Sequence, residues 1–339
     1  MSINRLERLS ARRTDPAITS AKLLNEAYRS IGQSDSVRYV IGAMQPIDPE
    51  YTKNTYTEGE RVCNQLQKRL SNKCDYEYQG SVTNDTHIKA RSDIDVLVLT
   101  KKYETLEDPQ VPSNPYKGNP IQDLLDLRTE SISSLESAFP EATVDSSGAK
   151  SVSIEGGSLR RKIDVVPSNW FNTNKYAETN QQMYRGVQIL DAENKTRLKN
   201  TPFLHNAWIA HRDGNTNGGL RKAARLMKSL KYDAESIDLS SYDIVSIAFN
   251  IPEADLNLPK NMELAILDSC HNFCMELQNN SYKREALEVP DGHRKIFTDG
   301  HATLNGLNRL TSALGDLVND VLRENARSFR KLAEARIDY

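Results

Sequence analysis

A Gly-Ser pair and two nearby aspartates are the residues of this sequence whose types and spacing best suit chemistry. Asp93 follows Ser81 of the pair Gly80-Ser81 by twelve residues, and Asp95 continues the strand-like run Asp-Ile-Asp-Val-Leu-Val-Leu. A glycine-serine turn offers backbone N–H groups and a hydroxyl to phosphate oxygens, and carboxylates bind divalent cations. The pattern therefore predicts a site for a nucleotide and its metal ions.

The two aspartates share one face of the predicted strand, because side chains alternate between the two faces. Asp93 and Asp95 would repel each other there, and a divalent cation between them would relieve the repulsion. The competing interpretation is an edge strand with two solvated acids. These two residues alone favour that second interpretation.

A third acid changes the balance. Asp164 lies in the strand-like segment Arg-Arg-Lys-Ile-Asp-Val-Val-Pro, which ends at Pro167. If this strand runs beside the first, three carboxylates converge and suit a pair of Mg²⁺ ions, with Mn²⁺ as an alternative. The chemistry would be two-metal phosphoryl or nucleotidyl transfer, in which Asp164 also accepts the proton of the attacking hydroxyl.

A helix over residues 219–230 combines an apolar arc with a basic stripe of Arg221, Arg225 and Lys228. Such a stripe is ordinarily a solvated face, and periodicity alone favours that interpretation. The alternative is that Lys228 reaches the triphosphate of a bound nucleotide.

The elements that must position these residues follow from periodicity and from turn residues. Helices are predicted over residues 18–33, 58–71 and 122–139, a polar loop over 104–119, and strands over 142–145, 151–155 and 159–166. Gly156-Gly157 joins the last two strands as a hairpin. Helices dominate beyond about residue 200. The chain is therefore expected to have an α/β half and an all-helical half, with a ligand cleft between them.

Composition limits the classes of function. The 339 residues carry a formal net charge of −2, which argues against a general nucleic-acid coat protein. No apolar run reaches the length of a membrane span, and the first residues lack a signal-peptide core. We expect a cytoplasmic protein without membrane association.

The cysteines offer a second candidate site. Four cysteines are too few and too unevenly spaced for a disulfide framework. Cys270, His271 and Cys274 could supply three zinc ligands, but no fourth ligand is near, and cysteines four residues apart in an apolar helix usually pack inward. Core packing is the favoured interpretation.

Several segments resemble a known family. Gly80-Ser81 and the stretches 92–97 and 163–167 resemble the active-site segments of polymerase-β-like nucleotidyltransferases. Residues 225–231 and 239–248 resemble the corresponding helices of cGAS/DncV-like nucleotidyltransferases (CD-NTases), which synthesise cyclic oligonucleotide second messengers.

The resemblance, which spans about residues 78–250, implies an α+β fold. It implies a polymerase-β-like nucleotidyltransferase core with a mixed sheet and N-terminal helices over residues 1–200. A helical C-terminal lobe over 201–339 would follow, with the active site in the cleft between them.

The resemblance also implies roles for the matching residues. The three aspartates would ligate Mg²⁺, and Gly80 and Ser81 would contact the donor triphosphate. Lys228 and Ser241 would hold the β and γ phosphates, and Tyr242 would stack on the donor base. Without the resemblance, a serine N-cap and a tyrosine packed at a helix start are favoured for the last two residues.

Asn169 follows the third acid by five residues and could read a base edge with its amide. Ordinary turn composition is the favoured interpretation of the segment Pro-Ser-Asn-Trp around it. The sequence departs from the family where a Gly-Thr pair is common, since Asn84-Asp85-Thr86 stands there. It also shows no zinc thumb and no broad basic surface, so a DNA-activated enzyme is not expected.

The leading hypothesis is Mg²⁺-dependent joining of nucleoside triphosphates into a cyclic di- or trinucleotide, with release of pyrophosphate. The resemblance points to the bacterial branch that acts against phage, in which a monomeric enzyme makes a product for a separate effector. The alternatives are a nucleotidyltransferase that modifies RNA or another acceptor, and a non-catalytic nucleotide-binding scaffold. Near-neutral charge weakens the RNA version, and the intact acid triad weakens the scaffold.

Overall fold

The computed structural model describes residues 5–14, 34–234, 236–300 and 302–337, which fall into two compact units. Unit 1 comprises Met1–Ile47, Thr86–Ala90 and Trp208–Tyr339, and unit 2 comprises Asp48–Asp85 and Arg91–Ala207. The helix predicted over residues 18–33 lies outside the described residues.

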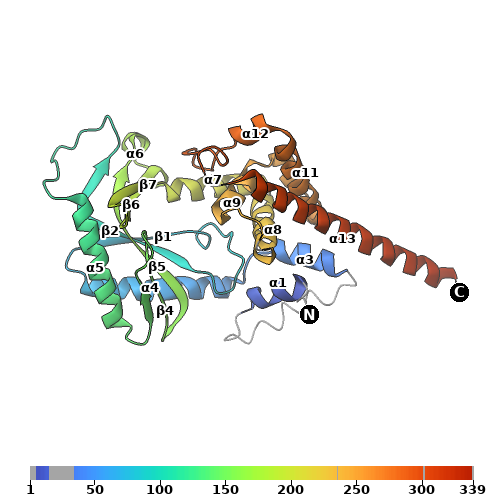
Figure 1. Cartoon of the computed structure of the whole chain (residues 1–339), viewed down its shortest axis with the longest axis horizontal. Coiled ribbons are helices and arrows are strands. Elements are labelled where there is room, and N and C mark those ends of the chain that lie inside the picture. The colour runs from blue at the N-terminus through green and yellow to red at the C-terminus, as the bar shows by residue number, and fades with distance from the viewer. Residues whose placement is uncertain (1–4, 15–33, 235, 301, 338–339) are drawn as a thin grey trace. The chain divides into compact units, whose positions relative to one another are not determined.

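Unit 2 is built on a mixed sheet, which has seven strands within the described part of the chain (Figure 1). The order is β1-β2-β5-β4-β3, and β6 pairs with both β5 and β7. β2 and β5 run parallel, and the other pairs are antiparallel. The strands are β1 (Cys74–Gln79), β2 (Ile94–Leu106), β3 (Thr143–Asp145), β4 (Val152–Gly156), β5 (Leu159–Asn172), β6 (Arg185–Asp191) and β7 (Thr196–Asn200).

The helices α4 (Pro49–Arg69) and α5 (Pro120–Ala138) cover one face of this sheet. Their leucines and valines pack against Ile94, Val96 and Val98 of β2 and against the matching residues of β5. Side chains alternate along a strand, so the residues between these belong to the opposite face. Leu97, Leu99 and Val166 form a second, smaller cluster there. Unit 2 also contains the short helices α6 (Asn174–Thr179) and η1 (Gln182–Tyr184).

The helix starts of unit 2 follow local capping rules. Asp48, the residue before Pro49, caps α4 by accepting a hydrogen bond from the backbone N–H of Glu50. Asn119, the residue before Pro120, caps α5 by accepting from the backbone N–H groups of the first turn. The helix predicted over 122–139 is therefore confirmed within two residues. The helix predicted over 58–71 is also confirmed, but it begins nine residues earlier because its start is fixed by this cap.

The strands show where local pattern is insufficient. The strands predicted over 142–145, 151–155 and 159–166 and the glycine hairpin are confirmed as β3, β4 and β5. β5 continues past Pro167 to Asn172 because β6 pairs with it from Ser168 onward. β2 continues to Leu106, so the predicted loop begins later. No strand was predicted at β1, β6 or β7.

Unit 1 is helical, as expected for the C-terminal part of the chain. Helix α7 (Pro202–Asn215) contains the division between the units, after Ala207. No helix among the described residues combines the length and the apolar character needed to cross a membrane. The other helices are α1 (Arg5–Arg13), α3 (Asp35–Met44), α8 (Gly219–Asp233), α9 (Ser241–Asn250), α10 (Glu253–Leu256), η2 (Lys260–Ala265), α11 (Ile266–Asn279), α12 (Ser281–Ala286) and α13 (Leu304–Ile337).

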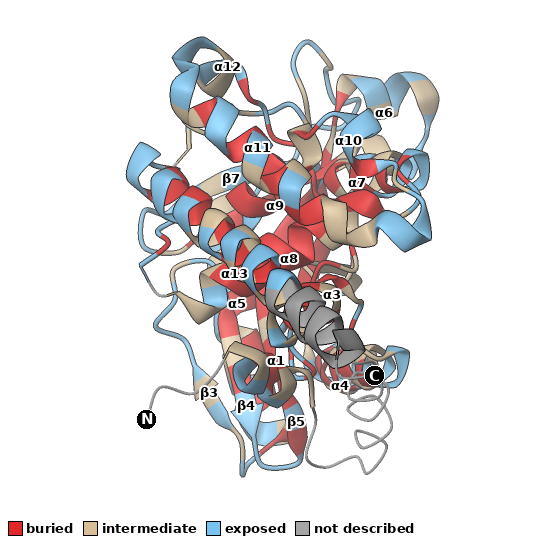
Figure 2. Ribbon diagram, turned by 90° about the vertical axis from the view of Figure 1, so that its right-hand side faces the viewer, coloured by how far each residue is buried: buried red, intermediate tan, exposed pale blue. Residues whose placement is uncertain are grey.

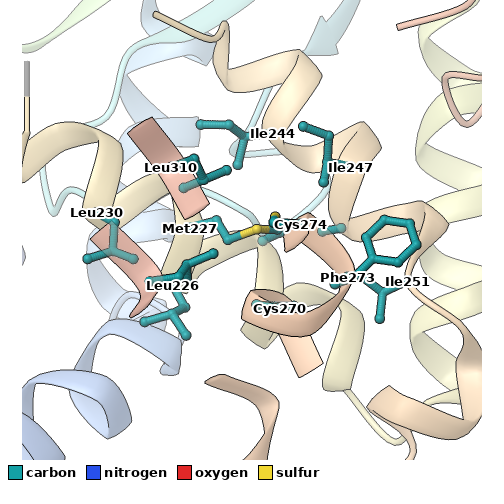
Figure 3. Packing of buried hydrophobic residues seen from close by; sticks show 14 of the residues in the cluster. Leu226, Met227, Leu230, Ile244, Ile247, Ile251, Cys270, Phe273, Cys274 and Leu310 are labelled. Atoms are coloured by element: carbon teal, nitrogen blue, oxygen red, sulfur yellow. The ribbon is translucent and has the colours of Figure 1, made fainter. Parts of the chain in front are cut away.

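Helix α8 lies at the centre of the unit 1 core, and most of it is buried (Figure 2). Figure 3 shows Met227 of α8 beside Cys274 of α11, among side chains from α9 and α13. Cys270 and Cys274 are both fully buried. The two cysteines therefore pack in the core, as predicted.

The N-terminal helices belong to the helical unit, whereas a single lobe over residues 1–200 was expected. Leu9 of α1 and Val40 and Met44 of α3 are buried in the same core as α8. The apolar faces of α1 and α3 pack here because helices associate where they bury apolar surface, whatever their order in the sequence.

A buried ion pair joins α1 to the end of α8. Arg12 Nη1 donates to Asp233 Oδ1 at 2.6 Å, and the side chains are only 3% and 4% exposed. The Tyr39 hydroxyl donates to the other oxygen, Oδ2, at 2.6 Å. Nε and Nη2 of Arg12 are buried and have no hydrogen-bond partner within the described residues. Asp233 is thus the counter-charge of a largely desolvated cation.

Asp233→Ala should destabilise unit 1 by about 3–5 kcal/mol, because it leaves the Arg12 guanidinium buried and unpaired. The measurement is the free energy of opening of α8 by native-state hydrogen exchange. The control is Arg323→Ala, which breaks an exposed pair with Asp320 and should cost less than about 1 kcal/mol. Equal losses of this free energy in the two variants would show that the buried pair stabilises unit 1 no more than the exposed pair does.

Candidate active site

The structure brings two of the predicted acids together on neighbouring strands. Asp95 of β2 and Asp164 of β5 are direct partners in the parallel register. Neighbouring strands are about 4.8 Å apart, so both carboxylates lie within reach of one cation. Both project from the face opposite α4 and α5, because Ile94, Val96, Ile163 and Val165 occupy the helix-covered face.

Asp93 lies one residue before β2 and is exposed. Its charge acts on both other aspartates. No group of three or more His, Cys, Asp or Glu side chains stands in a ready metal-binding arrangement among the described residues. The predicted convergence therefore takes the form of an in-register pair with a third acid nearby.

Burial and mutual repulsion raise the pKa values of Asp95 and Asp164. Burial, followed by the charges of Asp164 and Asp93, raises the pKa of Asp95 to about 7, and the Lys162 ammonium opposes this. Burial also raises the pKa of Asp164, with the charge of Asp93 adding to the effect and Lys162 opposing it. A strongly perturbed pair of acids on the sheet face opposite α4 and α5 is typical of a functional site.

Lys162 is a site residue that sequence reasoning missed. Its Nζ lies 3.5 Å from Asp164 Oδ1, an ion pair, yet this buried oxygen has no hydrogen-bond partner among the described residues. Strand alternation could have found Lys162, which lies two residues before Asp164 on the same face. Because the pair attracts one cation and leaves a carboxylate oxygen unsatisfied, the donor set fits a divalent metal ion.

The Gly-Ser turn adjoins the acids. Gln79 ends β1 as the antiparallel partner of Asp95, so Gly80 follows directly beside that carboxylate. Gly80 has φ +94°, and a Cβ there would lie 2.7 Å from Asp95 Oδ2. The position therefore requires glycine. Ser81 is half-buried, and its hydroxyl bonds to no residue that the structure describes.

Asn169 lies in a strand and not in the predicted turn, and its reading of a base edge stays a prediction. The residue is fully buried in β5. Its Nδ2 donates to the carbonyl oxygen of Trp170 at 2.8 Å and to Thr105 Oγ1 at 3.0 Å, while its Oδ1 accepts from the Tyr103 hydroxyl at 3.4 Å. The predicted turn is a strand covered by β6, which brings Gln188 opposite Asn169.

The basic stripe of α8 is not a solvated face. Arg225 and Lys228 are 4% and 5% exposed. Arg221 pairs with Asp213 at 2.7 Å, Arg225 Nε donates to the Met44 carbonyl oxygen at 2.7 Å, and Lys228 Nζ donates to the Thr86 carbonyl oxygen at 2.7 Å. Burial, followed by the charges of Lys231, Arg225 and Lys89, lowers the pKa of Lys228 to about 7.

The start of α9 carries the last two predicted residues. Ser240, not Ser241, is the N-cap and accepts from the Asp243 backbone N–H. Ser241 is exposed in the first turn, and Tyr242 is 36% exposed beneath the Arg294 guanidinium, 5.2 Å from the ring centre. Lys228, Ser241 and Tyr242 all belong to unit 1, and the aspartates and the turn belong to unit 2. The cleft between the halves stays a prediction.

Comparison with known proteins identifies the family. No protein-family model matches the chain. The cyclic dinucleotide synthase CdnE of Yersinia aleksiciae is 40% identical over 309 residues, which are 89% of this chain and 81% of that protein. The chain belongs to the CdnE family of cGAS/DncV-like nucleotidyltransferases.

Two further relatives agree with this family. A c-di-GMP synthase of a Lachnospiraceae bacterium (strain RUG226) is 34% identical over 281 residues, 74% of this chain and 80% of that protein. The solved structure of the STING-associated CdnE c-di-GMP synthase of Capnocytophaga granulosa matches with a TM-score of 0.78 and 29% identity. The match covers 94% of this chain and 98% of that one. The α+β fold of this family is thus confirmed.

Gly80→Ala should destabilise unit 2 more than Gly156→Ala. Both glycines have positive φ, +94° and +84°, so both variants lose about 1–2 kcal/mol to left-handed backbone. Only Gly80 would place its Cβ against Asp95, whereas nothing lies within 4 Å at Gly156. Urea unfolding followed by Trp170 fluorescence in a Trp208→Phe background measures the difference, which we expect to be about 1–3 kcal/mol. Equal losses would mean that Asp95 moves aside without cost.

Lys228→Met should stabilise unit 1 most at low pH. The folded pKa of Lys228 is about 7 against 10.5 for an unperturbed lysine, so the unfolded chain binds a proton that the folded chain lacks between these values. The free energy of unfolding of the wild type therefore rises with pH across this window, and this rise should be absent in the variant. Urea unfolding followed by circular dichroism at pH 6 and pH 9 measures it. Lys222→Met, on the same helix but not among the charges that act on Lys228, should keep the wild-type pH slope, and an unchanged slope in Lys228→Met would contradict the assignment.

Proposed function

We propose that the chain joins nucleoside triphosphates into a cyclic dinucleotide with release of pyrophosphate. The observation that carries the proposal is the in-register pairing of Asp95 with Asp164 beside the Gly80 turn. Membership of a family whose relatives are named cyclic dinucleotide synthases supports it.

The three aspartates Asp93, Asp95 and Asp164 would hold the divalent ion, Mg²⁺ or Mn²⁺. Bound there, it would neutralise charge on the phosphates and favour loss of the proton from an attacking hydroxyl. The buried Asp164 Oδ1 supports this assignment, because the Lys162 ammonium at 3.5 Å leaves it without a hydrogen bond among the described residues.

The remaining steps fall to the protein's own groups. The N–H groups and the Ser81 hydroxyl of the turn would bind the triphosphate and orient its α-phosphorus. Asp164 would accept the proton of the attacking hydroxyl. That oxygen bonds to the α-phosphorus as the bond to the bridging oxygen breaks, and pyrophosphate leaves. A second transfer of the same kind would close the ring.

Unit 1 would supply the remaining nucleotide contacts. Lys228 would bind a phosphate as a point charge, Ser241 would donate a hydroxyl, and Tyr242 would stack on a base. The exposure of Ser241 and Tyr242 at the start of α9 supports these roles. A phosphate would also restore the charge that burial removes from Lys228.

The relatives favour guanosine as at least one of the joined nucleosides, since two of them are named c-di-GMP synthases. We place the enzyme in anti-phage signalling, with a cytoplasmic product that acts on a separate effector. The STING association in the name of the Capnocytophaga granulosa enzyme supports a separate effector.

Incubation with the four nucleoside triphosphates and Mg²⁺ or Mn²⁺ should yield pyrophosphate and a phosphatase-resistant product, identified by mass spectrometry. The double variant Asp93→Ala, Asp95→Ala should lose at least about 10³-fold in rate, as expected when charge stabilisation in the transition state is removed. The control Glu136→Ala removes an exposed acid of α5 and should match the wild type.

Two outcomes would contradict this function. Extension of added RNA without a cyclic product would favour an RNA-modifying enzyme. Absence of pyrophosphate with every metal and nucleotide would favour a nucleotide-binding scaffold.

A further inference from the structure

The Gly80 turn is braced by two side chains that the proposed chemistry does not use. Thr83 Oγ1 donates to the Gly80 carbonyl oxygen at 2.7 Å. Asn206 Nδ2, from α7, donates to Thr83 Oγ1 at 2.9 Å. All three residues belong to unit 2, and Asn206 lies 123 residues beyond Thr83 in the sequence.

The direction of these hydrogen bonds is fixed by the groups involved. An amide nitrogen only donates, and a hydroxyl carries one proton. Because Thr83 Oγ1 accepts from Asn206, its own proton is directed at the Gly80 carbonyl oxygen. The two bonds form a chain, called the relay below, in which Asn206 donates to Thr83 and Thr83 donates to Gly80.

The Gly80 carbonyl and the Ser81 N–H belong to the same planar peptide group and point in opposite directions. A hydrogen bond that holds the carbonyl therefore also aims the Ser81 N–H away from Thr83. Asp95 restricts the turn from another side, since there is no room for a Cβ between Gly80 and Asp95 Oδ2. The peptide is thus held at its carbonyl oxygen, and the turn is restricted at the Gly80 Cα.

We propose that Thr83 and Asn206 are positioning residues that hold the Gly80-Ser81 peptide ready for the donor triphosphate. The inference rests on the proposed function, because the turn is taken to bind phosphate. A short threonine-to-carbonyl bond alone is common in turns. The support from Asn206 distinguishes this turn, because it fixes the hydroxyl that would otherwise rotate.

The first test compares Thr83→Val with Thr83→Ser. Valine keeps the shape and loses the hydroxyl, and serine keeps the hydroxyl. Calorimetry with Mg²⁺ and a non-hydrolysable GTP analogue should show a Kd about 3- to 10-fold higher for Thr83→Val, the cost of one hydrogen bond. Thr83→Ser should stay within about twofold of wild type. The KM for GTP should rise with the Kd while kcat changes less, which a general loss of folding would not produce.

The second test reverses the relay. In Asn206→Asp the carboxylate only accepts, so it takes the Thr83 proton away from the Gly80 carbonyl oxygen. Asn200→Asp is the matched control, because its amide donates to Gln79 Oε1, at 3.2 Å, rather than to Thr83, and it adds the same charge nearby. Asn206→Asp should weaken binding of the analogue at least about threefold more than Asn200→Asp does.

Each outcome decides the matter. A wild-type affinity for the analogue in Thr83→Val, or equal losses in Asn206→Asp and Asn200→Asp, would overturn the relay while leaving the proposed function intact. A wild-type protein that binds no triphosphate and releases no pyrophosphate would overturn the proposed function and this inference with it.

Discussion

The repulsion between Asp95 and Asp164 is the constraint on which the site depends, and the sheet register imposes it. Val96 and Ile163 must face α4 and α5, and a one-residue slip of either strand would turn its whole apolar set to the wrong face. Burial of these side chains is worth about 1.5–3 kcal/mol each, so the apolar set outweighs the repulsion of one acidic pair. Hydrophobic packing on one face therefore holds two carboxylates together on the other.

The same constraint explains the turn. Because β1 pairs with β2, the chain must leave β1 directly beside the Asp95 carboxylate, and only glycine fits there with its positive φ. Lys162, two residues before Asp164 on β5, offsets part of the negative charge of the acids. The site thus combines a cation, a crowded carboxylate and a backbone turn within three adjacent strands, groups that suit a metal-bound triphosphate.

Local pattern was sufficient for the acids and insufficient for their surroundings. Alternation and the Gly-Ser pair predicted which residues share the site, since both features operate within a few residues. The turn predicted around Asn169 is wrong because strand β6, which pairs with this segment, was not predicted. Lys228 and Arg225 looked solvated because helical periodicity does not reveal a second buried face, and the backbone carbonyls that accept from them come from distant segments.

The segment Thr86–Ala90, between the Gly80 turn and Asp93 in the sequence, belongs to the helical unit. Residues on both sides of it belong to unit 2, yet the segment itself belongs to unit 1. Lys228 Nζ donates to the carbonyl oxygen of Thr86, the first residue of the segment. The Ala90 N–H donates to the carbonyl oxygen of Arg12, at 2.8 Å, and the Arg12 side chain forms the buried pair with Asp233. Three residues later the chain reaches Asp93. Both ends of this segment are therefore held within unit 1, by helices α1 and α8.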